Sequence, residues 1–205
     1  MLTPLDQVLA ALQFYATGTF QSVVGNVLKL SQSSISRSVH DVSNALASIA
    51  KDHIYFNTNL LVVGLLVASR IIKINIHVYY LQIKLEFFDI AKMVGVIECI
   101  DGTHFRISRP QIHEAAFVNR KSYHSINAQA IFNAHGRFLS VNVSKPGSVH
   151  DSTMFKSSAI GKKFSARNFG EGYLLGDSGY GCTPFLLTPY ADPSTREEVF
   201  YPFSL

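Results

Sequence analysis

The 205-residue sequence is poor in cysteine, in charge and in long apolar runs. Its two cysteines, Cys99 and Cys182, lie far apart in no paired motif, which argues against a zinc ribbon or a disulfide-stapled secreted fold and favours a reducing compartment. We expect both to be small core residues. Charged residues make up 16% and hydrophobic residues 47% of the chain, a balance typical of a globular protein rather than a disordered one.

The most apolar segment, Asn59 to Ile83, is too short in its uninterrupted part to cross a bilayer. That part runs from Leu60 to Ala68, whereas a spanning helix needs about 20 apolar residues. Arg70 and Lys73 then interrupt it, each at a cost of about 2.5 kcal/mol or more at a helix centre. We therefore expect no membrane span, and either a buried helix or strand or sequence foreign to the fold.

The first fifty-six residues have the apolar periodicity of helices. The segment "LDQVLAALQFYATG" predicts a helix that ends at Gly18, and "TFQSVVGNVLKLSQSSISRSVHDVSNALASIA" predicts a helix, a tight turn and a second helix capped by Ser31. The expected inner faces are Val8, Leu9, Leu12 and Tyr15 in the first helix, Val23, Val24 and Val27 in the second, and Ile35, Val39, Val42 and Leu46 in the third.

This pattern is the outline of a helix-turn-helix. Its outward residues include Gln32, Arg37 and His40, whose side chains suit contacts with phosphates and base edges of DNA. A formal charge of +4 and a pI of about 9.1 suit a polyanion, although many ordinary proteins are as basic. From the pattern alone, a plain helical hairpin that covers a core is the favoured interpretation.

After Lys84 the pattern changes to mixed α/β without internal repeats. "LEFFDIAKM" predicts a short amphipathic helix, and "VGVIECI" a buried strand that ends at Asp101. A second strand is expected in "HFRISR", two more around the His-Gly turn of "HSINAQAIFNAHGRFLSVNVS", a helix in "HDSTMFKSSAIGKKF", and a buried strand in "GYLLGD" that ends at Asp177.

Three aspartates stand at the expected ends of elements: Asp101, Asp151 and Asp177. Carboxylates that converge at a sheet edge bind Mg²⁺ or Mn²⁺, and a pair of such ions activates water and stabilises the leaving oxygen of a phosphodiester. His104 and His150 are candidates to orient the carboxylates or contact phosphate. Each aspartate also has a simpler interpretation: Asp151 as an N-cap, and the other two as turn residues.

Four motifs, "GVIECIDGTHFRI", "NRKSYHSINAQAIF", "KPGSVHDSTMF" and "YLLGDSGYGCTPFLLTPY", occur together and in this order. They resemble the DDE domain of Harbinger (PIF-type) transposases and of their domesticated nuclease relatives. The upstream "VLAALQFYATGTFQSVVGNVLKLSQSSISRSVHDVSNAL" resembles the helical region that precedes that domain. The match covers most of residues 5–56 and 85–196, and it changes the favoured interpretation of the first segment to a helix-turn-helix.

The resemblance implies an RNase H-like mixed sheet flanked by helices and a divalent-metal-dependent nuclease that acts on DNA. It implies that Asp101 is the first catalytic aspartate and that Asp151 and Asp177 are metal ligands. A position after a strand beside the first favours Asp177 as the central catalytic member and Asp151 as an auxiliary ligand. The family also implies a Myb/SANT-like partner protein and a nuclear location, with the cytoplasm as an alternative that depends on the partner.

The chain departs from the family pattern in two places. The family's last acidic ligand, a glutamate on a helix, is not found before Leu205, so we expect the C-terminal part of the catalytic fold, and with it some activity, to be missing. The apolar stretch at about 60–82 is unlike the family, and we interpret it as inserted or wrongly joined coding sequence. The expected divisions are thus a helical region (1–56), an atypical segment (57–84) and a nuclease domain (85–205).

Two other functions compete with a nuclease. One is a non-catalytic DNA-binding or interaction protein that keeps only the helical region of a domesticated transposase. The other is a metallohydrolase acting on small phosphoesters, which ranks last because the sequence shows no paired His-x-His or His-Asp ligand spacing.

Overall fold

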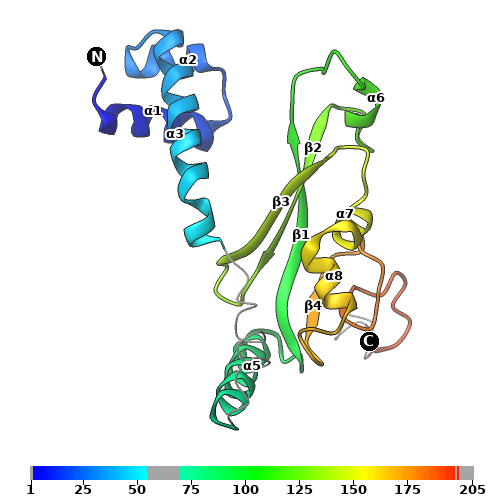
Figure 1. Ribbon diagram of the computed structural model, residues 1–205. Helices are drawn as coiled ribbons and strands as arrows, with labels where there is room; N and C mark the ends of the chain where they lie inside the picture. The colour runs from blue at the N-terminus through cyan, green and yellow to red at the C-terminus, as the bar shows by residue number, and fades with distance from the viewer. Residues whose placement is uncertain (1, 55–69, 197, 199–205) are drawn as a thin grey trace. The chain divides into compact units, whose positions relative to one another are not determined.

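The computed structural model describes residues 2–54, 70–196 and 198, which form two compact units (Figure 1). The first unit, Met1–Ile54, is helical, and the second, Tyr55–Leu205, is mixed α/β. The units therefore divide close to the boundary expected after residue 56. Part of the atypical segment, residues 55–69, lies outside the described residues.

The first unit consists of three helices with the ends that the sequence indicates: α1 (Pro4–Thr17), α2 (Gln21–Leu28) and α3 (Gln32–His53). A capping box between Thr3 and Asp6 starts α1, and Gly18 ends it in the left-handed conformation with φ of 58°. The Ser31 side chain accepts a hydrogen bond from the backbone N–H of Ser34 and caps α3 as predicted.

The turn between α2 and α3 is tight because the backbone at Gly25 approaches the backbone at Leu30. Leu30 N donates to Gly25 O at 2.8 Å, and Lys29 adopts the left-handed conformation. A Cβ on Gly25 would lie 2.6 Å from Leu30 O, so this close approach requires glycine. Two helices joined by three residues make the helix-turn-helix outline that the sequence predicts.

The expected inner faces of α1 and α2 are partly wrong. Ala10 and Ala11 form the buried face of α1, whereas Val8, Leu9, Leu12 and Tyr15 are exposed. Small residues let helices pack closely where they cross, and here they decide which face turns inward. Val24 is buried but Val23 and Val27 are exposed; on α3, Ile35 and Val42 are buried, Val39 packs against the core, and Leu46 is exposed.

In the described part of the second unit, the first helix is α5 (Arg70–Ala91), which extends well upstream of the short helix expected at "LEFFDIAKM". Ile83 and Phe87 on this helix join the core cluster of the sheet. Within the described part of the chain, no helix combines the length and the apolar character that a membrane crossing needs. The apolar run Leu60 to Ala68 lies outside the described residues.

A five-stranded mixed sheet in the order β3-β2-β1-β4-β5 carries the second unit, and its flanking helices confirm the predicted fold class. Strand β1 pairs antiparallel with β2 and parallel with β4, while β2–β3 is antiparallel and β4–β5 parallel. The strands are β1 (Val96–Arg106), β2 (Ser125–Phe132), β3 (Phe138–Pro146), β4 (Tyr173–Leu175) and β5 (Leu186–Leu187).

Strand β1 is longer than the sequence indicates. The two strands expected at "VGVIECI" and "HFRISR" are one strand of 11 residues, whose pairing with β2 continues from Cys99 to Arg106. Asp101 therefore lies inside β1 and not at its end. The Asp-Gly dipeptide favours a turn locally, but the uninterrupted ladder to β2 overrides that preference.

Helices α7 (Asp151–Ser157) and α8 (Ala159–Ser165) pack side by side, and α7 lies against β2 (Figure 1). A short α6 (Glu114–Phe117) precedes β2. Ser158 separates α7 from α8: its hydroxyl donates to Phe155 O and accepts from Gly161 N. Phe155 and Phe164 are buried beneath these helices and contact Phe185, with ring centroids 6.4 and 6.3 Å away.

One carboxylic acid, Glu98 of β1, lies inside the core. It is 4% exposed, and its Oε2 has no hydrogen-bond partner among the described residues. Burial raises the pKa of Glu98 to about 9, so the folded protein keeps it neutral near pH 7. The adjacent Cys99 is half-buried, and burial, helped by Glu98, raises the pKa of its thiol to about 11. Cys182, expected in the core, is exposed.

The buried glutamic acid predicts a pH-dependent stability. Between its ordinary pKa of 4.5 and the folded value of about 9, the unfolded chain has lost the Glu98 proton and the folded chain retains it. This group therefore lowers the free energy of unfolding by about 1.4 kcal/mol per pH unit as the pH rises through that window. Urea unfolding from pH 5 to 8 should show this decline in the wild type and a flatter profile in Glu98→Gln. Equal slopes in the two proteins would contradict the assignment.

Candidate functional site

Asp151 lies against β1 at a position that only glycine leaves open. It is the first residue of α7, and its Oδ1 occupies the place of a side chain on Gly102. A Cβ on Gly179 would lie 3.3 Å from Asp151 Oδ2 and 3.0 Å from Asp177 Oδ1. The carboxylates of Asp151 and Asp177 therefore both lie close to Gly179, and the absence of a side chain at Gly102 and Gly179 leaves room for them.

Two buried amides of β2 hold Asp151. Asn127 Nδ2 donates to Asp151 Oδ1 at 2.8 Å and to Val149 O at 3.0 Å. Gln129 Nε2 donates to the main-chain oxygen of Asp151 at 3.1 Å and to the Tyr180 hydroxyl oxygen at 2.9 Å. The N-cap of α7 is His150, and no side chain caps the helix, so the N-cap interpretation of Asp151 is wrong.

Asp177 follows β4 by two residues and is exposed. Its Oδ1 accepts a hydrogen bond from Gly179 N at 3.0 Å, which is the turn role considered for it. Strand β4 lies directly beside β1 in parallel, with Cys99 opposite Leu175. Asp177 thus stands after the strand adjacent to the one that carries Asp101, which is the arrangement behind its expected central role.

Asp101 is exposed and projects from the other pleat face of β1. Consecutive strand residues alternate between faces, so Asp101 and Gly102 face opposite ways, and Asp151 contacts Gly102. Asp101 Oδ1 accepts a hydrogen bond from Gly102 N at 2.8 Å. Among the described residues, no group of three or more His, Cys, Asp and Glu side chains is arranged closely enough to hold a metal ion.

The three aspartates nevertheless share one electrostatic neighbour, the buried hydroxyl of Tyr180. Burial raises the pKa of Tyr180, the hydrogen bond from Gln129 lowers it, and the charges of Asp151, Asp101 and Asp177 raise it further. None of the ion pairs found in the described part of the chain involves these three carboxylates. Tyr180 is thus an electrostatic neighbour of all three carboxyl groups, none of which has an ion-pair partner among the described residues.

The two histidines occupy different surroundings. His104 is half-buried, and its Nδ1 lies 3.1 Å from the hydroxyl of Ser125, which also accepts a hydrogen bond from Asn119 Nδ2 at 2.9 Å. His104 thus belongs to a network at the far end of β1. His150 is exposed and precedes Asp151 at the start of α7. Their roles as auxiliary residues stay predictions.

In the first unit, the residues expected to contact DNA lie on the surface of α3. Gln32, Arg37 and His40 are all exposed, whereas Ile35 and Ser38 on the same helix are buried. His40 Nε2 lies 3.0 Å from Asn44 Nδ2, so the ring is held along the helix. These three side chains are accessible to a ligand of the helix-turn-helix.

Three residues around the aspartates were not predicted from the sequence: Asn127, Gln129 and Tyr180. A signal for the two amides is present in "SINAQAIF", where polar residues alternate inside an apolar strand. A buried strand normally places apolar side chains on the face that packs against a helix. Polar side chains at these positions therefore indicate hydrogen bonds to another buried group. Tyr180 gives no comparable signal, because its buried setting follows from the tertiary fold.

Comparison with known proteins identifies the family. Residues 100–201, which include all three aspartates, match the DDE superfamily endonuclease family. The chain is 34% identical to "Putative nuclease HARBI1" of Bos taurus and 32% identical to that of Homo sapiens, in each case over 98% of this chain and 52% of the relative. It is 25% identical to "Protein ALP1-like" of Arabidopsis thaliana, over 93% of this chain and 46% of that protein.

No solved structure matches the chain. The chain spans about half the length of the curated relatives that it matches. The matched region nevertheless includes most of the mixed sheet, α7, and both Asp151 and Asp177. The chain thus carries a DDE superfamily endonuclease domain and is homologous to the Harbinger transposase-derived nuclease HARBI1.

Proposed function

We propose that this chain is a divalent-metal-dependent nuclease acting on DNA phosphodiester bonds. The observation that carries the proposal is the group of three carboxylates around Tyr180, which have no ion-pair partner within the described residues. Unpaired carboxylates near one another repel, and a bound cation offsets that repulsion. The endonuclease family of the chain supplies the reaction class.

The donor set fits Mg²⁺ or Mn²⁺, which prefer carboxylate oxygens. Asp151 and Asp177, whose carboxylates both lie close to Gly179, would hold the ion, and Asp101, which projects from the opposite face of β1, would join them only after a local rearrangement of that strand. A bound ion would supply activation of water and stabilisation of the leaving oxygen. Asn127 and Gln129 fix the carboxylate and the backbone of Asp151, so that residue is ordered before any ligand arrives.

Replacement of the aspartates tests the chemistry. In a Mn²⁺-dependent plasmid-nicking assay, Asp101→Ala, Asp151→Asn and Asp177→Asn should each reduce the nicking rate by about 10²-fold or more, because a misplaced reacting group alone costs that much. Asp89→Asn, an exposed carboxylate on α5, is the matched control and should nick like the wild type. A nicking rate equal to that of the wild type in all three variants would refute the proposed site.

The amide of Asn127 should matter through Asp151. Asn127→Leu removes the donor, and Mn²⁺ affinity, followed by titration calorimetry, should fall by about 10–100-fold, as for other residues that orient a metal ligand. High Mn²⁺ should restore part of the nicking rate. Asn168→Leu, at an exposed position, controls for the loss of an amide. Unchanged metal affinity in a folded Asn127→Leu protein would show that the hydrogen bond is only structural.

A second candidate function, DNA binding without cutting, is favoured by the exposed Gln32, Arg37 and His40 on the helix-turn-helix. The first unit would bind duplex DNA in the nucleus, whatever the activity of the second unit. A Myb/SANT-like partner would use the apolar side chains that α1 exposes, Leu5, Leu9 and Leu12 among them. Such a partner would account for nuclear entry, since the longest basic runs, "NRK" and "GKKF", are short.

The salt dependence of duplex binding tests this second function. If Arg37 contacts a phosphate, Arg37→Ala should flatten the slope of log affinity against log salt by about 0.9. Lys51→Ala removes the same charge from the other end of α3 and should leave the slope unchanged. Binding with the wild-type slope in Arg37→Ala would exclude this contact.

A further inference from the structure

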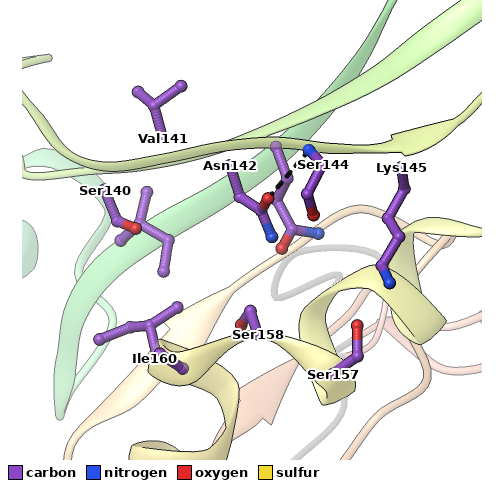
Figure 2. A pocket seen from close by; sticks show the side chains of 11 residues that line it. Ser140, Val141, Asn142, Ser144, Lys145, Ser157, Ser158 and Ile160 are labelled. Carbon is purple, nitrogen blue, oxygen red and sulfur yellow. Dashed lines mark hydrogen bonds between the residues drawn. The ribbon is translucent and has the colours of Figure 1, made fainter.

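A polar pocket lies beside the aspartates, between the edge strand β3 and the helices α7 and α8 (Figure 2). Its volume of about 400 Å³ is within the range of small-ligand sites, roughly 300–1,000 Å³. Lys145 and Asn142 reach into it from β3, and Ser157 and Ser158 face them from the helices. None of the aspartates lines it.

The β3 wall of the pocket offers hydrogen-bond donors and one positive charge. Among the described residues that line the pocket, Lys145 alone is charged. Asn142 Oδ1 accepts a hydrogen bond from Ser144 N at 3.1 Å, so the Nδ2 donor of Asn142 points away from Ser144 N. The hydroxyls of Ser157 and Ser158 are committed as donors to the carbonyls of Met154 and Phe155. Donors for an anion therefore come from β3, and the helices contribute acceptors.

The surrounding charge also favours an anion. Besides Lys145, the elements that build the pocket carry Lys162 and Lys163 on α8 and a single carboxylate, Asp151, at the far end of α7, whereas Lys156 of α7 lines a different pocket. One ammonium with neutral donors suits a singly charged oxyanion, such as one phosphodiester of a nucleotide chain.

Gln129 connects this pocket to the aspartate site. It lines the pocket, and its Nε2 donates to Asp151 O and to the Tyr180 hydroxyl. Asp151 and Ser157 stand at opposite ends of α7, about 9 Å apart at 1.5 Å of rise per residue. At about 3.4 Å per nucleotide of one strand, this corresponds to two or three nucleotides.

We propose that this pocket binds a phosphate group of a nucleotide chain through Lys145, Ser144 and Asn142. The inference rests on the proposed nuclease function. In this proposal, β3 binds the DNA strand a few nucleotides from the bond that is cut. Such a contact would orient the strand on the enzyme without reading its sequence.

The test is the binding of a fluorescent single-stranded oligonucleotide to the full chain without divalent metal, at several salt concentrations. Lys145→Gln should flatten the slope of log affinity against log salt by about 0.7, the value for one phosphate on a single strand, and Lys145→Arg should retain the wild-type slope. Lys92→Gln, which removes the same charge after α5, is the matched control. Ser144→Asp, which places a carboxylate at the exposed rim, should weaken binding further.

Competition identifies the source of the phosphate. An excess of AMP that leaves the oligonucleotide bound supports a strand site, whereas displacement at equal phosphate concentration reassigns the same pocket to free nucleotides. Equal slopes in wild type and Lys145→Gln, or an equal change in Lys92→Gln, would overturn the proposal. If nicking depends on Asp101 but Lys145→Gln leaves the salt slope of binding unchanged, the proposal for the pocket alone is refuted. If Lys145→Gln changes that slope but the protein does not nick DNA, the proposed nuclease function alone is refuted.

Discussion

The site depends on one steric constraint, the contact between the Asp151 carboxylate and the Cα of Gly102. Because residue 102 has no side chain, the first turn of α7 lies directly on β1, and Oδ1 takes the space of a Cβ. The same contact brings Asp151 to the strand that carries Asp101 and toward Asp177 after the neighbouring strand β4. Strand β1 pairs antiparallel with β2 on one side and parallel with β4 on the other. The carboxylates therefore lie between a hairpin and a strand that is reached by a crossover connection.

Strand β2 supplies the second constraint, because its inward face is polar. Ser125, Asn127 and Gln129 are almost completely buried at alternate positions, where a sheet normally packs apolar side chains against a helix. Each of the two amides bonds to Asp151, and Gln129 extends the network to Tyr180 and to the pocket beside β3. The stability lost by burying these amides is offset by hydrogen bonds that order α7, so the helix position is specified by polar contacts as well as by Phe155 and Met154.

Capping and turn residues in the sequence correctly predicted where several helices and strands begin or end. Gly18 and Ser31 end and cap helices as expected, and the His-Gly turn joins β2 to β3, where Asn133 Oδ1 accepts from the backbone N–H groups of His135 and Arg137. The features that depend on remote partners were not predictable. Asp101-Gly102 favours a turn locally, yet pairing with β2 keeps it in a strand, and the inward face of α1 is set by close packing at Ala10 and Ala11 rather than by its large apolar residues. For the site, the motifs predict the three aspartates, whose roles stay predictions, whereas the partner that the amides of "SINAQAIF" hold, Asp151, is identified only by the fold.

The surroundings of Tyr180 disfavour one role for its hydroxyl in the proposed nuclease, that of a nucleophile. A phenol becomes a good nucleophile when its pKa is lowered or a base takes its proton. Tyr180 is 2% exposed, and both burial and the nearby carboxylates oppose its ionisation. Its oxygen already accepts a hydrogen bond from Gln129. In the proposed nuclease, a covalent phosphotyrosine link between this residue and a DNA end is therefore disfavoured.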